Sequence, residues 1–158
     1  MGNSEPNWLT PEESETWLAV WSMYVWLPAR LDAQLKRNSG LSHFDYFALA
    51  QISQAEDQTI RMRELAGAAD MTLSHLSRVV TRLERNGWVE RIPDPDDGRS
   101  TLAHLTPQGW EKVKESAPGH VGEVRRLVFD NLSEDEAKAL GAAAKKIVTA
   151  LAPPNLPH

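Results

Sequence analysis

The fold is decided by residues 63–106, which read RELAGAADMTLSHLSRVVTRLERNGWVERIPDPDDGRSTLAHLT. The first part, 63–70, is rich in small residues and predicts a compact helix. A second helix is expected over 73–86, because Thr72 is a favourable N-cap residue and Gly87 tolerates the left-handed backbone that often ends a helix. Apolar residues recur at helical spacing in both segments, so the two helices are expected to pack together across a short turn.

Beyond Gly87 the pattern changes from helical to extended. Residues 88–92 (WVERI) and 102–105 (LAHL) read as strands, and the residues between them, PDPDDGRS, are mostly turn formers. Two paired helices followed by a hairpin with a polar tip is the order of a winged helix-turn-helix. In that motif the second helix enters the major groove of DNA, and the hairpin, or wing, reaches the neighbouring minor groove.

On the N-terminal side, Thr10-Pro11-Glu12-Glu13 marks the start of a long helix that is expected to reach about Asn38, with a kink at Pro28. Apolar residues at spacings of three, four and seven form one stripe along it. The stripe consists of Trp17, Trp21, Tyr24, Val25, Leu31 and Leu35. It exceeds what a small core can cover, so we expect it to pack against another chain; burial within the same chain is the alternative. A helix over 44–55 and an extended segment over 59–62 follow.

The composition excludes several classes of protein. The 158 residues contain no cysteine, which removes disulfides and thiolate metal sites and suits the cytoplasm. No apolar run near the start reaches the roughly 20 residues of a membrane span, so we expect no membrane partner. The net charge of −5 opposes DNA binding, but residues 61–92 carry six arginines against four carboxylates. Solvation of the surface is the plainer explanation of those charges.

The five histidines, at positions 43, 75, 104, 120 and 158, do not have the spacing of metal ligands. Ser74 and His75 are adjacent on a helix and point about 100° apart, so they are not a nucleophile and its base. A Gly-rich phosphate loop is also missing. We therefore expect no metal, no cofactor and no enzyme activity.

The most specific motif lies in the wing and just beyond it: Asp97-Gly98-Arg99 is followed by Leu105-Thr106 and then Gly109. Further matching residues stand upstream at the expected distances, namely Ser74, Ser77, Arg78, Leu83, Glu84, Gly87, Val89, Glu90 and Arg91. In this order the sequence resembles the multiple antibiotic resistance regulator (MarR) family of bacterial repressors over nearly its whole length.

The resemblance implies a mostly α fold, in which a winged helix-turn-helix lies between N- and C-terminal dimerisation helices. The implied order is helix, helix, strand, helix, helix, strand, wing, strand, helix, helix. We expect one domain over 1–158, with a DNA-binding lobe at 42–106, dimerisation helices at 8–41 and 107–151, and a disordered tail at 152–158. Two departures from the family pattern are Pro118-Gly119, expected to break or bend the long helix after Thr106, and Gly98, expected to loosen the wing tip.

The resemblance also assigns the DNA-binding residues. By matching position, Arg99 resembles the wing arginine that enters the minor groove, and Asp97 resembles the acid that orients it. Residues expected on the helix that faces the major groove are Thr72, Ser74, His75, Ser77, Arg78, Thr81 and Arg82, with His75 at a variable position that tunes sequence preference. Arg82 and Arg85 have an alternative role as surface charges paired with Glu84 or Glu90.

Family members commonly bind small aromatic or phenolic anions between the dimer base and the DNA lobe. The matching residues here are Trp21, Tyr24, Arg30, His43, Phe44 and Tyr46. As a hypothesis, Arg30 or His43 pairs with the anionic group while the aromatic rings cover the ligand; ordinary helix packing is the alternative.

Three functions can be ranked on these observations. The leading one is a homodimeric transcription regulator, expected to be a repressor, that binds double-stranded DNA at a pseudo-palindromic operator and is released by a small aromatic ligand. The second is a winged-helix module that contacts protein and does not bind DNA. An enzyme is the weakest, because the sequence holds no cluster of acids, bases or metal ligands.

Overall fold

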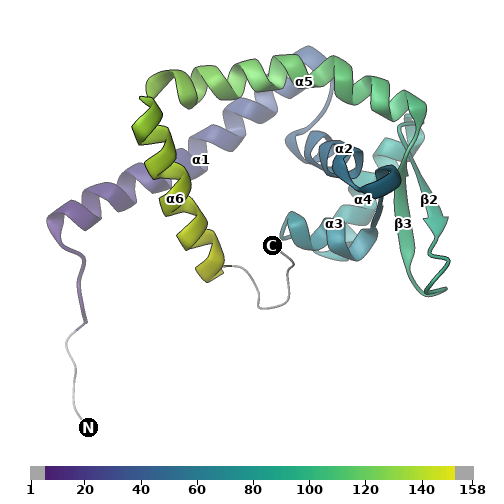
Figure 1. Cartoon of the computed structure of the whole chain (residues 1–158), viewed down its shortest axis with the longest axis horizontal. Coiled ribbons are helices and arrows are strands. Elements are labelled where there is room, and N and C mark those ends of the chain that lie inside the picture. Colours follow the sequence, from purple (N-terminus) through teal and green to yellow (C-terminus); the bar gives the residue numbers. More distant parts are fainter. Residues whose placement is uncertain (1–5, 152–158) are drawn as a thin grey trace, which may run out of the picture.

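The computed structural model of the chain describes residues 6–151, so the tail expected at 152–158 lies outside the described residues. Six α-helices and three strands follow the predicted order (Figure 1). The helices are α1 (Pro11–Ser39), α2 (His43–Gln54), α3 (Met62–Ala68), α4 (Leu73–Arg85), α5 (Pro107–Leu127) and α6 (Glu134–Leu151). The strands are β1 (Thr59–Arg61), β2 (Val89–Pro93) and β3 (Thr101–Leu105), and two short 3-10 turns are η1 (Glu56–Gln58) and η2 (Phe129–Asn131).

Hydroxyl side chains set the starts of five of these helices. Each of them accepts a hydrogen bond from the backbone N–H three residues further on, and the residues are Thr10, Ser42, Thr72, Thr106 and Ser133. Such a bond satisfies one of the backbone donors that the first turn of a helix leaves free. The predicted starts at Pro11, Leu73 and Pro107 are therefore confirmed.

The sheet is small and antiparallel, with β3 between β1 and β2. Thr59 pairs with His104 on one side of β3, and Val89 pairs with Leu105 on the other. The hairpin of β2 and β3 with its loop 94–100 is the wing, which projects away from α5 (Figure 1).

The core lies inside the lobe formed by α2, α3, α4 and the sheet. Leu49, Ile52, Leu65, Val79 and Leu105 are fully buried there. Only the C-terminal part of α1 contributes to this core, through Leu35. The apolar faces predicted for the helix pair thus build the core that positions the wing and α4.

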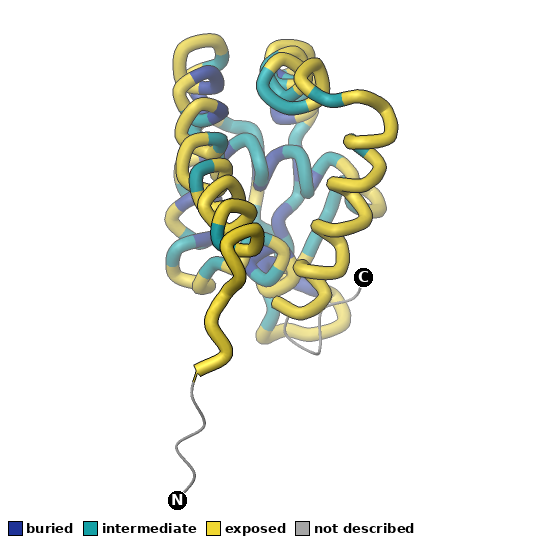
Figure 2. Tube along the Cα trace, turned by 90° about the vertical axis from the view of Figure 1, so that its left-hand side faces the viewer, coloured by how far each residue is buried: buried dark blue, intermediate teal, exposed yellow. Residues whose placement is uncertain are grey.

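The remaining helices cover little of each other. α5 packs along α1, whereas α6 holds no buried residue (Figures 1 and 2). The first half of α1 exposes most of its tryptophan stripe: Trp17 and Trp21 are 52% and 51% exposed, and Tyr24 is 68% exposed. Burial of this part of the stripe within the chain, which the sequence left open, is therefore not seen.

Of the break or bend expected at Pro118-Gly119, the break is wrong, because α5 runs through both residues without interruption, and the bend stays a prediction. A proline inside a helix removes one backbone hydrogen bond, and packing can offset that loss. Here α5 lies against α1, and a Cβ added to Gly119 would approach Nε2 of Gln34 to 3.4 Å. That distance is an ordinary van der Waals contact, so α1 and α5 lie side by side here without requiring a glycine. α1 is likewise one helix through Pro28.

Candidate nucleic-acid interface

The helix α4 divides cleanly into a buried and an exposed face. Leu76, Val79, Val80 and Leu83 point into the core. Thr72, Ser74 and Arg78 are exposed, and Ser77 and Thr81 are partly exposed. The predicted polar set of this helix, apart from His75 and Arg82, therefore lies on or beside its free face.

His75 lies at the edge of that face, beside α2. Its ring contacts Phe44 edge to face, with 5.3 Å between the ring centroids. The ring is only partly exposed as a result. Its expected role in sequence preference stays a prediction.

Arg82 has a partner that the sequence did not suggest. Its guanidinium forms an ion pair of 2.6 Å with Asp45 at the start of α2, rather than with Glu84 or Glu90. Asp45 also accepts the backbone N–H of Ser42, so the same carboxylate caps α2 and holds α4. This pairing argues against a contact between Arg82 and DNA.

Two carboxylates fold the loop of the wing. The Asp94 side chain is 2% exposed and accepts Nε of Arg61 at 2.7 Å and the backbone N–H of Asp96 at 2.9 Å. The Arg61 guanidinium and these backbone donors hold the pKa of Asp94 below its usual range. The ion pair joins the wing to β1, the strand on the far side of the sheet.

Asp97 acts at the tip of the wing. It accepts the backbone N–H of Arg99 at 3.0 Å and the hydroxyl of Ser100 at 2.9 Å, and these bonds lower its pKa. Its contact with Arg99 is therefore through the backbone. The exposed Arg99 side chain is directed by the shape of the turn.

Arg91 connects the wing to α4 and was not among the predicted site residues. Its Nη2 donates to the carbonyl oxygen of Ser77 at 2.8 Å, to the Ser77 hydroxyl at 3.1 Å and to the Thr81 hydroxyl at 3.2 Å. Its Nη1 forms an ion pair with Glu84. The sequence did show that Arg91 belongs to the family pattern, because a Val-Glu-Arg strand follows a helix that contains Leu-Glu near its end. It did not show that the Arg91 side chain reaches Ser77 and Thr81.

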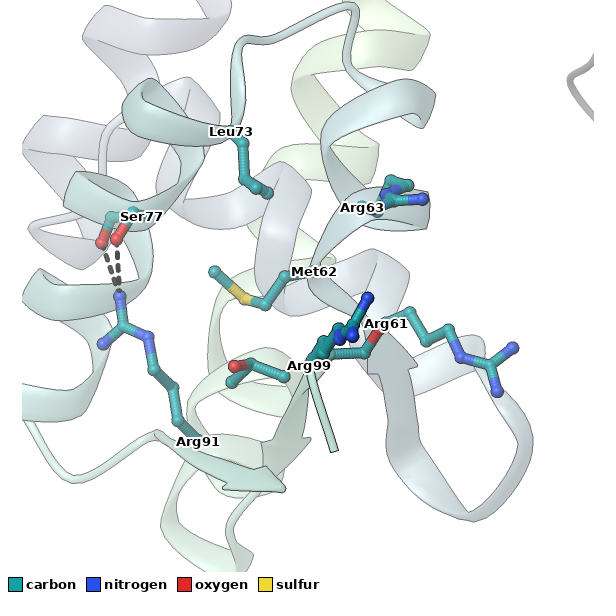
Figure 3. A pocket seen from close by; sticks show the side chains of 9 residues that line it. Arg61, Met62, Arg63, Leu73, Ser77, Arg91 and Arg99 are labelled. Carbon is teal, nitrogen blue, oxygen red and sulfur yellow. Dashed lines mark hydrogen bonds between the residues drawn. The ribbon is translucent and has the colours of Figure 1, made fainter. Parts of the chain in front are cut away.

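A groove of about 200 Å³ opens between α4 and the wing. We call it the α4–wing groove. Its lining residues are Arg61, Met62, Arg63, Leu73, Ser77, Arg91, Arg99, Ser100 and Thr101. In Figure 3, Met62 lies at the centre, Arg91 reaches Ser77 on one side, and Arg63 and Arg99 lie on the other. Arginines and hydroxyls gathered in this way favour an anionic ligand.

The residues expected to bind an aromatic effector do not meet in one cavity. Trp21 and Tyr24 contact each other on the exposed part of α1, with their rings tilted by 43° and the ring centroids 5.7 Å apart. Arg30 lines a separate apolar groove of about 390 Å³ between α1 and the end of α5. His43 and Tyr46 instead lie beside His120 of α5, whose ring centroid is 4.4 Å from that of Tyr46.

The junction of α1, α2 and α5 contains polar atoms that the sequence did not single out. Buried side-chain atoms of Gln34, His43, Ser116 and His120 have no hydrogen-bond partner within the described part of the chain. Burial, and then the charge of His43, lowers the pKa of His120.

Two features are absent from residues 6–151. No group of three or more His, Cys, Asp or Glu side chains there is arranged to hold a metal ion. No helix within the same residues combines the length and apolar character that crossing a membrane requires.

Comparison with known proteins places this geometry in a family. The model of the MarR family matches residues 41–101. The structure of Sco3205, a MarR family transcriptional regulator from Streptomyces coelicolor solved in complex with DNA, superposes with a TM-score of 0.90 at 41% identity over 98% of each chain. AbsC, another MarR family regulator of that organism, gives a TM-score of 0.87 at 34% identity over 92% of this chain and 98% of its own.

A curated relative is the multiple antibiotic resistance protein MarR of Salmonella typhimurium, 33% identical over 85 residues. That match covers 54% of this chain and 59% of the relative, so the chain spans little more than half of it. Likeness to Sco3205 extends over nearly the whole of both chains and agrees with the expectation that this is no enzyme. The chain belongs to the MarR family of transcriptional regulators.

Proposed function

We propose that the protein is a transcriptional repressor that binds double-stranded DNA as a homodimer at a pseudo-palindromic operator. The observation that carries the proposal is the pairing of α4 and the wing around a groove lined by four arginines. α4 fits the major groove, and Arg99 at the wing tip fits the narrow, electronegative minor groove of A/T-rich DNA. The crystal structure of the similar Sco3205 with DNA supports this assignment.

The homodimer is supported by apolar surface that the chain leaves uncovered. α6 has 18 residues and none is buried, although Ile147 and Val148 are 53% and 59% exposed. Most of the stability of a helix in a folded protein comes from packing of its apolar face, and in the single chain α6 buries no residue. A second copy that covers α6 and the first half of α1 removes the apolar surface from water and stabilises both helices. The two α4 helices then read half-sites about 34 Å apart, one turn of DNA.

The experiment is a fluorescence anisotropy titration of DNA flanking the protein's own gene, at several salt concentrations. Wild-type protein is expected to bind, with affinity that falls steeply as salt rises. Arg99→Ala is expected to weaken binding to A/T-flanked sites and to flatten the salt dependence, whereas Arg37→Ala, an exposed arginine at the end of α1, serves as the matched control. Failure of the wild type to bind any such duplex at low salt would favour a module that contacts protein.

Release by a small aromatic or phenolic anion is the second part of the proposal. The supporting observation is the junction of α1, α2 and α5, where Nδ1 of His43 and Nδ1 of His120 are buried beside the Tyr46 ring and find no hydrogen-bond partner among residues 6–151. Titration with salicylate is expected to raise the melting temperature and weaken DNA binding. No change in either quantity would contradict this part and leave DNA binding intact. A cytoplasmic location, suggested by the absence of cysteine, belongs to the same proposal.

A further inference from the structure

The four arginines of the α4–wing groove are not equivalent. Arg61 donates to Asp94 at 2.7 Å, and in Figure 3 its side chain points away from the centre of the groove. Arg91 is held by Glu84, Ser77 and Thr81. Within residues 6–151, Arg63 and Arg99 take part in none of the ion pairs, and both are exposed. Two guanidinium groups on the rim of the groove are therefore free to bind an anion.

The geometry of a DNA duplex determines which part of the DNA lies beside these two guanidinium groups. A major groove and the neighbouring minor groove are separated by one sugar-phosphate strand. If α4 occupies the major groove and Arg99 the minor groove, that strand must cross the space between α4 and the wing. Within residues 6–151 the α4–wing groove occupies this place, and it offers the Ser77 hydroxyl beside the arginines.

We propose that the α4–wing groove binds one phosphate of this DNA strand, and that Arg63 is the residue that contacts it. The proposal rests on the proposed DNA-binding function and names a contact that the resemblance did not assign. Arg63 is suited to the role because the preceding residue, Met62, is 7% exposed and anchors the start of α3 in the core. A guanidinium presents a planar pair of donors that matches a phosphate.

The other arginines have different roles in this site. Arg91 is a positioning residue, since its donors already hold Ser77 and Thr81 on α4. Arg61 positions the wing through Asp94. Arg99 is directed to the minor groove, so the phosphate contact depends on Arg63.

The test compares Arg63→Gln with Arg37→Gln, which removes the same charge from the end of α1. Losing one phosphate contact lowers the slope of log affinity against log salt by about 0.9, so a dimer that loses two is expected to lose about 1.8. The corresponding loss of affinity is on the order of tens-fold at about 0.1 M salt. Arg37→Gln is expected to keep the wild-type slope.

A second measurement locates the contact on the DNA. A single neutral methylphosphonate is placed at each phosphate of the strand between the two grooves. One position is expected to weaken wild-type binding by roughly the square root of that factor, because it removes one of the dimer's two contacts, and to leave Arg63→Gln unaffected. The proposal would be overturned if, at every position, the methylphosphonate weakened binding of the wild-type protein and of Arg63→Gln equally.

The outcomes separate the proposals from each other. Wild-type protein that binds no duplex refutes DNA binding itself, whereas wild-type binding with equal slopes for Arg63→Gln and Arg37→Gln refutes only the phosphate site. Inorganic phosphate is titrated at constant ionic strength as a third arm. Saturable binding that requires Arg63 but does not compete with DNA would show a site for a free phosphate and would overturn the assignment to the DNA strand.

Discussion

Gly109 offers the sharpest test of how the lobe is joined to α5. A Cβ built at this position would lie 2.0 Å from the carbonyl oxygen of Trp88 and 2.7 Å from Cδ1 of Leu105. Contacts below 3.0 Å are not adopted by real Cβ atoms, so Gly109→Ala must separate α5 from the start of β2 by about 1 Å. That shift breaks the bonds from Thr106 N–H to the Trp88 oxygen (3.0 Å) and from the Thr106 hydroxyl to the Gly87 oxygen (2.6 Å).

The expected loss follows from these contacts. Two hydrogen bonds contribute about 1 kcal/mol each, and overpacking costs about 1–3 kcal/mol, so the variant is expected to lose roughly 3–5 kcal/mol. A chain of this size loses about 2–4 °C of melting temperature per kcal/mol, so a fall of roughly 6–20 °C is expected. Thermal unfolding followed by circular dichroism at fixed protein concentration measures it.

The matched control is Gly122→Ala, in the middle of the same helix, where an added Cβ meets no atom within 4 Å. Alanine favours helix over glycine, so this variant is expected to be neutral or more stable by up to about 1 kcal/mol. Equal melting temperatures for the two variants would refute the reasoning. The glycine of the wing motif would then have some role other than the close approach to Trp88.

Three further variants test other contacts. Arg82→Gln is expected to lower the free energy of unfolding, measured in urea, by about 0.5–1 kcal/mol, because it removes the half-exposed ion pair with Asp45. The variant is expected to keep the wild-type dependence of DNA affinity on salt concentration. A weaker salt dependence would show that Arg82 contacts DNA after all. Burial and the neighbouring His43 lower the pKa of His120, so the unfolded chain takes up a proton more readily than the folded one, and the free energy of unfolding falls as the pH drops below about 6.5. His120→Gln is expected to flatten that fall when the free energy of unfolding is measured by urea titration at several pH values. A pH profile equal to that of the wild type would contradict this role of His120. Val148→Asp places a charge on the exposed face of α6 and is expected to give monomers in analytical ultracentrifugation, whereas an unchanged dimer would exclude this face from the interface.

Most of the fold could be predicted because its signals are local. An N-cap hydroxyl such as Thr10 or Thr106 acts on a backbone N–H three residues away, and the sequence displays both partners together. The change from helical to alternating pattern at Gly87 likewise lies within a few residues. Pro118 was misjudged because a local rule was applied where packing of α5 against α1 decides the outcome.

The site was predicted less completely, because its contacts join residues distant in sequence. Asp45 and Arg82 are 37 residues apart, and Arg61 and Asp94 are 33 apart. Nothing in a single sequence indicates which carboxylate a given arginine will meet. The positions on α4 and the wing could therefore be named, but not which of their charges remain free.

That distinction explains how a chain with a net charge of −5 can present a cationic face to DNA. Carboxylates in the lobe do not simply cancel its arginines; Asp45, Glu84 and Asp94 each hold one arginine in a structural contact. Other arginines have no such partner within residues 6–151. Examples are Arg78 on the exposed face of α4 and Arg99 at the tip of the wing. Phosphate affinity depends on the cations within reach of the strand rather than on the total charge, because screening limits each charge to about 8–10 Å. Adding an acidic residue farther than this from α4 and the wing, at a position outside the proposed dimer surface, should therefore change DNA affinity far less than neutralising one free arginine of the lobe.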